Sequence, residues 1–216
     1  MSRNKGMFIS IEGGEGTGKT TQIGMLAESL RKQGHDVVTT REPGGTPEAE
    51  KIRELLVHRN GGDWTPMAEI LLFFAARQMH VTQLIMPALT AGKIVISDRF
   101  TDSTRVYQSY GHGVEPDIIE SFVHLALGGF EPDMTFILDI AVDKGLARAG
   151  RRQNETDIKE DRFEKIGMAF HEKLRQGFFA IAERFPERCV MIDADRTINE
   201  IANEMQMIAL RRLQNV

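Results

Sequence analysis

A glycine-rich segment near the start of the chain has the residue types and spacing of a phosphate-binding loop. Glycines let a backbone curl so that successive N–H groups point at phosphate oxygens, and a helix starting at Lys19 adds its positive end. Lys19 is expected to bridge the β- and γ-phosphates, and the Thr20 hydroxyl is expected to help hold Mg²⁺. The segment matches G-x-x-x-x-G-K-[ST] and, with Thr21, predicts a nucleoside triphosphate site: Gly13, Gly14, Glu15, Gly16, Thr17, Gly18, Lys19 and Thr20.

Glu15 is an unusual residue for such a loop, because its carboxylate repels phosphates unless it points away from them. One reading is a solvated side chain. The other is that Glu15 faces a second substrate and accepts a hydrogen bond from a hydroxyl or a basic group. The residue types alone leave both readings open.

Several charged residues indicate a second, anionic ligand. Asp98 ends an apolar run and suits a carboxylate that helps to organise Mg²⁺, usually through water. Arg99 follows it and forms either a plain salt bridge or a phosphate contact; the expected place of this strand beside the loop favours phosphate. Arg41 ends another apolar run, and Arg77 lies in an apolar stretch where its charge needs a partner. Guanidinium groups suit phosphate and carbonyl oxygens.

The elements that must position these residues alternate along the chain. Apolar runs predict five strands, with helical periodicity between them, which is typical of a parallel sheet covered by helices on both faces. Ligands bind such α/β folds at the carboxyl ends of the strands, where Glu12, Arg41 and Asp98 fall. The expected strands are Met7–Glu12, Val37–Arg41, Ile94–Asp98, Met134–Ile140 and Cys189–Asp193; the expected helices are Lys19–Gln33, Pro47–His58, Pro66–Ala91, Pro116–Leu127, Arg162–Glu183 and Asn199–Leu213.

Composition narrows the function classes. The 216 residues suit one domain over 1–216, and a net charge of −4 without a basic tract argues against a non-specific nucleic-acid partner. No apolar run is long enough to span a bilayer. Cys189, the only cysteine, is expected to be buried and inert, and a cytoplasmic location is consistent with it. The only Asn-Lys pair, Asn4-Lys5, precedes the first strand, which argues against a guanine-reading switch protein.

Combined with the phosphate loop, further motifs resemble the thymidylate kinase family over nearly the whole chain. Thr40-Arg-Glu-Pro-Gly-Gly-Thr46 is highly specific to that family. The other matching stretches are Leu72–His80, Asp98–Phe100, Ser103–Gln108, Asp161–Glu164 and Ile192–Ala194. The resemblance implies a P-loop NTPase fold, transfer of phosphate from ATP-Mg²⁺ to dTMP, and a homodimer. Another P-loop kinase, or a DNA-handling ATPase, is the rival class.

The resemblance also implies roles around the acceptor. Phe73 is similar to the ring that stacks on thymine, Arg77 to the donor to its carbonyl at position 4, and Gln108 to a contact at the base edge. Cytosine presents an amino donor where thymine has that carbonyl, so Arg77 would exclude it. The remaining matches lie around the sugar and phosphate: Arg99 and Arg41 at the phosphate, Tyr107 at the 2′ position, Glu15 at the 3′-hydroxyl, and Ser103 among the binding residues.

The segment 148–161 is polar and falls between helical patterns. It resembles the basic lid found in the bacterial type of thymidylate kinase. Its arginines are Arg148, Arg151 and Arg152, and Arg151 is expected to close over the transferring phosphate. The alternative is a solvated basic turn. The chain departs from the family at Ala76, Val106 and Ser109, and Arg105 occupies a variable position that is expected near the base. These residues affect the details of the base pocket.

Overall fold

The computed structural model describes residues 6–58, 62–153 and 167–214. Five parallel strands form one sheet in the order β2-β3-β1-β4-β5, so the expected α/β fold is confirmed. All five expected strands are present within one residue of their predicted ends: β1 (Met7–Gly13), β2 (Val37–Arg41), β3 (Ile94–Asp98), β4 (Met134–Asp139) and β5 (Cys189–Asp193).

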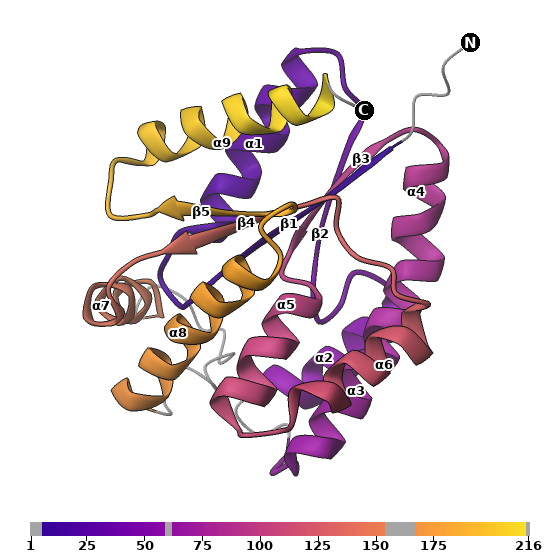
Figure 1. Ribbon diagram of the computed structural model, residues 1–216. Helices are drawn as coiled ribbons and strands as arrows, with labels where there is room; N and C mark the ends of the chain where they lie inside the picture. The colour runs from indigo at the N-terminus through magenta and orange to yellow at the C-terminus, as the bar shows by residue number, and fades with distance from the viewer. Residues whose placement is uncertain (1–5, 59–61, 154–166, 215–216) are drawn as a thin grey trace.

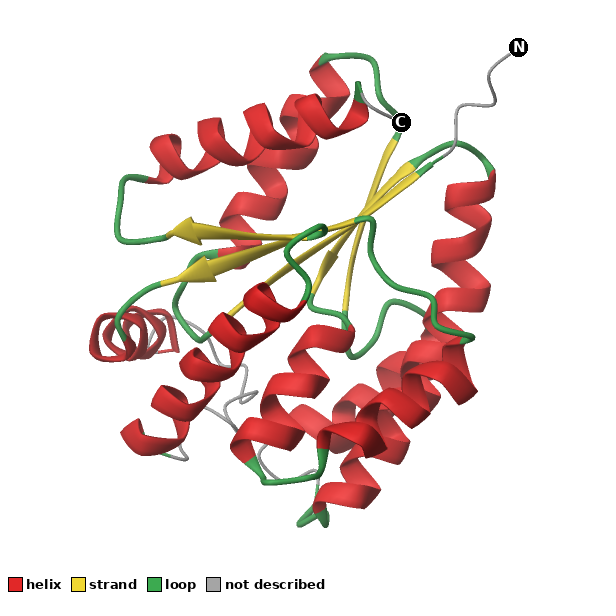
Figure 2. Cartoon of the chain, viewed as in Figure 1, coloured by secondary structure: helices red, strands yellow, loops and turns green. Residues whose placement is uncertain are grey.

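Helices cover both faces of the sheet, which lies between them as the yellow layer in Figure 2. On one face α1 (Lys19–Lys32) packs beside α9 (Ile198–Leu213), as Figure 1 shows. The core there joins apolar residues of both helices to the alternating positions Ile9 and Ile11 of β1. The helices α5 (Thr101–Thr104), α6 (Pro116–Leu127) and α8 (Met168–Arg184) lie on the other side, with α2 (Pro47–Val57) and α3 (Pro66–His80) beyond them.

The helix expected over 66–91 is one continuous segment with a change of pitch. It consists of α3, a π-helical turn η1 (Val81–Ile85) and α4 (Met86–Thr90). Pro87 has no backbone N–H and its ring conflicts with the preceding turn of a regular helix, and the wider π turn lies directly before it.

Two helical segments were not predicted. One combines α5 with a π-helical segment η2 (Arg105–Gly111), and the other is α7 (Val142–Gln153). The prediction that 148–161 falls between helices is therefore wrong for 148–153, which form the end of α7. Residues 154–161, and the first residues of the helix expected from Arg162, lie outside the described residues.

The order of the strands places the predicted residues at one edge. Because β1 pairs with both β3 and β4, and β3 with β2, the carboxyl ends of β1, β2 and β3 lie side by side. Cys189 is buried, as expected, and burial raises the pKa of its thiol to about 12. Among the described helices, none is both long and apolar enough to cross a membrane.

Candidate functional site

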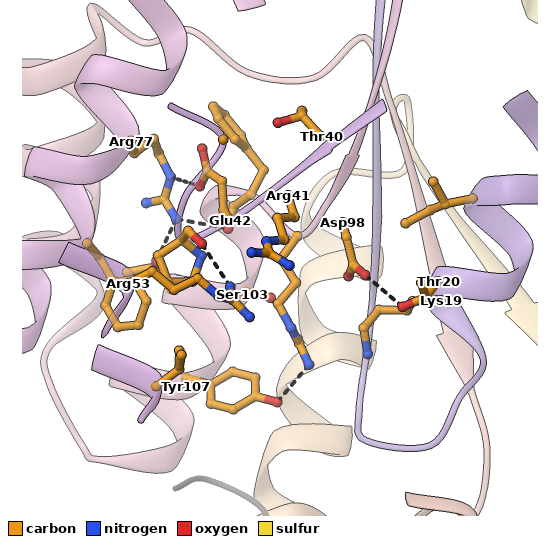
Figure 3. A pocket seen from close by; sticks show the side chains of 18 of the residues that line it. Lys19, Thr20, Thr40, Arg41, Glu42, Arg53, Arg77, Asp98, Ser103 and Tyr107 are labelled. Carbon is orange, nitrogen blue, oxygen red and sulfur yellow. Dashed lines mark hydrogen bonds and ion pairs between the residues drawn. The ribbon is translucent and has the colours of Figure 1, made fainter. Parts of the chain in front are cut away.

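A cavity of about 820 Å³ opens at the carboxyl ends of β1, β2 and β3. Figure 3 shows Lys19, Thr20 and Asp98 on one side of it, and Arg77, Glu42, Arg53 and Tyr107 on the other. The structure brings together all eight residues predicted for the second ligand, which line this cavity: Glu15, Arg41, Phe73, Arg77, Arg99, Ser103, Tyr107 and Gln108.

The phosphate loop forms the first side of the cavity. Lys19, at the start of α1, donates to the carbonyls of Gly13 at 3.1 Å and Gly14 at 2.8 Å, so its ammonium group lies inside the loop. Burial, together with the charge of Arg99, lowers the pKa of Lys19 to about 8. A phosphate group beside this side chain would favour its charged form.

The loop also makes a close backbone contact with α7. Gly16 has a φ of 68°, and a Cβ there would meet the carbonyl oxygen of Gly145. A Cβ on Gly145 would in turn lie 2.5 Å from the carbonyl oxygen of Glu15. Glycine at both positions therefore allows α7 to pack directly on the loop.

We expect Gly145→Ala to destabilise the protein although alanine normally favours a helix. The added methyl group must push α7 away from Glu15, whereas a Cβ at Gly150 of the same helix meets nothing within 4 Å. The control Gly150→Ala should stabilise by about 0.5–1 kcal/mol from helix propensity. Thermal or denaturant unfolding measures both, and a Gly145→Ala protein as stable as the control would contradict the close contact.

Asp98 and Thr20 form the candidate metal position. The Thr20 hydroxyl donates to the Asp98 carboxylate at 3.2 Å, and both side chains line the cavity beside Lys19. Within the described residues there is no group of three His, Cys, Asp or Glu side chains that could hold a metal. Mg²⁺ bound to a nucleotide takes most of its ligands from phosphates and water, so one hydroxyl and one carboxylate fit it.

Arg99 lies at the centre of the site, in a left-handed backbone conformation with a φ of 70°. Its guanidinium donates to the Gly13 carbonyl at 3.1 Å, the Ser103 hydroxyl at 3.0 Å, the Glu15 carboxylate at 2.9 Å and the Tyr107 hydroxyl at 3.2 Å. Partial burial would raise the pKa of Glu15, but the charges of Arg99 and Lys19 outweigh it and lower this pKa to about 2. Glu15 is therefore paired, not simply solvated.

Glu12 holds the backbone that follows Arg99, from Phe100 to Ser103. It was not predicted from the sequence as a site residue. Its buried carboxylate accepts from the Phe100 amide at 2.7 Å and from the Ser103 hydroxyl at 2.5 Å. Burial, with a further contribution from nearby Asp102, raises the pKa of Glu12 to about 8. Its only sequence signal was a carboxylate at the end of an apolar strand.

The far side of the cavity holds Arg77, which is buried as expected with a partner. Its Nε donates to Glu42 at 2.6 Å, and its Nη2 to the Phe100 carbonyl at 3.2 Å and the Thr104 hydroxyl at 3.0 Å. Its Nη1 is buried without a hydrogen-bond partner among the described residues, and so is Oε1 of Gln108. Gln108 donates its Nε2 to Glu69 at 3.2 Å, which identifies Oε1 as the atom left to accept.

Some predicted residues lie elsewhere. Arg151 is exposed on α7 and is not among the residues that line the cavity, in the described part of the chain. Arg105, which was expected near the base, is not among the described residues that line the cavity. It is buried in ion pairs with Asp102, Glu120 and Glu131, because η2 directs it away from the cavity. Four predicted loop residues are not part of the described lining: Gly13, Gly14, Thr17 and Thr21.

Two arginines flank the middle of the cavity. Arg41 is half exposed and pairs with Glu50 at 3.1 Å. Arg53, on α2, lines the cavity and donates to the Pro43 carbonyl at 2.8 Å; its sequence context gives no sign of this role. Arg41 ends β2 and Arg53 lies on α2, so only the fold shows that both reach the same cavity.

Comparisons with known proteins agree with this geometry. A family model described as thymidylate kinase matches residues 11–205. Thymidylate kinase of Caulobacter vibrioides is 47% identical over 209 residues, which cover 97% of this chain and 98% of that protein. Thymidylate kinase of Geobacter sulfurreducens is 45% identical over 209 residues, covering 96% and 98%.

A solved structure is also similar. The crystal structure of thymidylate kinase from Ehrlichia chaffeensis has a TM-score of 0.75 and 36% sequence identity, covering 95% of this chain and 98% of that one. The family model and these relatives extend over nearly the whole length of the chain, including the phosphate loop and the cavity residues. The chain belongs to the thymidylate kinase family.

Proposed function

We infer that this chain phosphorylates dTMP to dTDP with ATP as the phosphate donor, a step that feeds the supply of dTTP for DNA synthesis. The family and the relatives support the reaction class. The observation that carries the choice of base is the pair of unsatisfied buried atoms, Nη1 of Arg77 and Oε1 of Gln108.

These two atoms are complementary to one edge of thymine. Thymine presents a carbonyl acceptor at position 4 and an N–H donor at position 3. Arg77 offers a donor and Gln108 an acceptor, whereas cytosine presents the opposite pattern. A mismatched base would leave buried polar groups unpaired, which disfavours it strongly. Phe73 lines the same cavity and would contact the face of the base.

ATP and dTMP would meet end to end in the cavity. The triphosphate lies in the loop with Lys19, and the dTMP phosphate lies near Arg99, Arg41 and Arg53. An oxygen of that phosphate attacks the γ-phosphorus in line, the bond to the β–γ bridging oxygen breaks, and ADP leaves. The attacking oxygen is already ionised at neutral pH, so no general base is needed, and catalysis rests on positioning and charge neutralisation.

We propose that Thr20 and Asp98 hold Mg²⁺, which when bound neutralises charge on the β- and γ-phosphates. Tyr107 and Glu15 would lie at the sugar, with Tyr107 crowding the 2′ position and Glu15 meeting the 3′-hydroxyl. Their hydroxyl and carboxylate are 3.0 Å apart and share the cavity. Arg151 remains our choice for the arginine that closes over the transferring phosphate; residues 154–161 of the proposed lid lie outside the described residues.

The inference is tested by one coupled ADP-release assay with dTMP, dUMP, dCMP, UMP and thymidine as acceptors. We expect dTMP to have the highest kcat/KM, dUMP to follow because it shares the same base edge, and dCMP to be poor. Rapid consumption of another acceptor, with dTMP left unphosphorylated, would overturn the assignment.

ATP binding should depend on pH through Lys19. The lysine is charged below its pKa of about 8 and loses its charge above it, and bound phosphates restore the charge. One pH unit above that pKa only about one free molecule in ten is charged, so ATP affinity should fall by up to about tenfold and binding should take up a proton. Calorimetry in two buffers of different ionisation enthalpy measures this uptake. Lys19→Arg, which stays charged, should abolish it; equal uptake by both proteins would contradict the role of Lys19.

We also propose a homodimer formed through helices. Large apolar side chains are exposed on α3 and α6: Met67 at 40%, Leu71 at 53% and Leu125 at 83%. Light scattering on the purified protein would test this by its mass. A single domain over 1–216, a cytoplasmic location and the absence of a nucleic-acid or membrane partner remain part of the proposal.

A further inference from the structure

A largely buried chain of hydrogen bonds supports Arg77, and two of its members, Thr40 and Glu42, also line the cavity. The Thr40 hydroxyl and Nε2 of His80 are 2.7 Å apart, and Nδ1 of His80 lies 2.9 Å from Oε1 of Glu42. The other carboxylate oxygen of Glu42 accepts from Nε of Arg77 at 2.6 Å. The chain thus runs from β2 and the loop after it to α3.

These bonds fix the plane of the Arg77 guanidinium. Glu42 holds Nε, and the Phe100 carbonyl and Thr104 hydroxyl hold Nη2. A guanidinium is planar, so fixing two of its nitrogens fixes the direction of the third. That third nitrogen is Nη1, the buried donor without a partner among the described residues.

His80 acts only through its neighbours, because it is fully buried and is not one of the residues that line the cavity. A carboxylate can only accept, so Nδ1 carries the proton that faces Glu42; in a neutral ring, Nε2 then accepts from the Thr40 hydroxyl. The ring is also confined: a Cβ on Gly45 would lie 2.5 Å from its Cδ2 atom. The ring therefore packs closely against the backbone of Gly45, which limits the orientations open to it.

We propose that His80 and Glu42 are positioning residues for base selectivity: they aim Nη1 of Arg77 at the carbonyl that distinguishes thymine from cytosine. This inference rests on the proposed contact between Arg77 and the base. Its consequence is that selectivity depends on a histidine that touches no substrate and on the glutamate of the glycine loop.

The test compares the ratio of kcat/KM for dTMP to that for dCMP in four variants. His80→Phe fills the space but removes both hydrogen bonds, whereas His80→Asn keeps a donor near the place of Nδ1 and leaves a gap. Glu42→Gln keeps the shape but removes the charge that faces Arg77. Ile119→Val, in the apolar contact between α6 and α3, is the control for packing alone.

We expect His80→Phe and Glu42→Gln to lower the ratio by about tenfold, the effect of one misdirected charged hydrogen bond, and to raise the KM for dTMP. The KM for ATP should stay constant, and His80→Asn should retain more selectivity than His80→Phe. A purely structural role predicts the reverse order, because phenylalanine fills the site better. That reverse order, or an unchanged ratio in Glu42→Gln despite a lower melting temperature, would overturn the inference.

Arg77→Ala separates this failure from failure of the base contact itself. We expect it to lower the ratio at least as far as His80→Phe does. If Arg77→Ala lowers the ratio and neither His80→Phe nor Glu42→Gln does, the positioning role is wrong and the base contact stands. If Arg77→Ala leaves the ratio unchanged, both are wrong, whereas phosphorylation of dTMP in the acceptor assay would still hold.

Discussion

Replacing Lys19 with alanine should lower kcat by roughly 10²–10³-fold, the usual cost of losing one charge-stabilising donor in an enzyme site. The Nζ atom lies inside the phosphate loop and donates to the carbonyls of Gly13 and Gly14. From there it can stabilise the negative charge that develops on the transferring phosphate. The loop amides remain in the variant, so a large part of ATP binding should survive while turnover falls.

The measurement is ADP release at saturating ATP and dTMP. Lys32→Ala is the matched control, because Lys32 lies at the end of the same helix, exposed and paired with Glu28. We expect that control to turn over like the unaltered protein. Turnover of Lys19→Ala equal to that of the control would contradict the role assigned to Lys19.

Replacing Arg99 with glycine should lower kcat by a similar factor, roughly 10²–10³-fold. It should also raise the KM for dTMP, because the acceptor phosphate would lose its central donor. Glycine is the informative replacement. Arg99 has a φ of 70°, which glycine adopts without strain, so the turn between β3 and α5 can keep its path without the side chain.

The fall in kcat of Arg99→Gly should be separable from a general loss of folded structure. Arg184→Ala is the control, because Arg184 pairs with Glu120 at 3.0 Å, away from the cavity. It should leave both kcat and KM unchanged. If Arg99→Gly kept the KM for dTMP and lost only melting temperature, Arg99 would be a structural residue that holds Glu15, and the acceptor phosphate would have to bind elsewhere.

The strands and the phosphate loop could be predicted because their signals are local. Residues 7–11 form a continuous apolar run apart from Ser10, and the glycine spacing after it fits few other structures. The pairing of β1 with β3 then placed Asp98 and Arg99 beside the loop, as expected from the sheet rules. Arg77 was selected because a charge in an apolar helix requires a partner, and Glu42 is that partner.

The missed helices lack that local signal. The segment Thr101–Arg105 is polar yet buried, since Asp102 is neutralised by Arg188 at 2.6 Å and by Arg105 at 2.9 Å. Arg188 is 86 positions away in sequence, so apolar periodicity could not reveal the pairing. The same network explains why Arg105 does not line the cavity although it lies two positions from Tyr107.

The central claim is that ATP and dTMP meet phosphate to phosphate in one cavity, and it is tested most directly by a compound in which adenosine and thymidine are joined through their phosphates. We predict that one molecule binds per chain, that it competes with both ATP and dTMP, and that it binds more tightly than either. Competition with only one of the two substrates, or simultaneous binding of the compound and dTMP, would contradict the account.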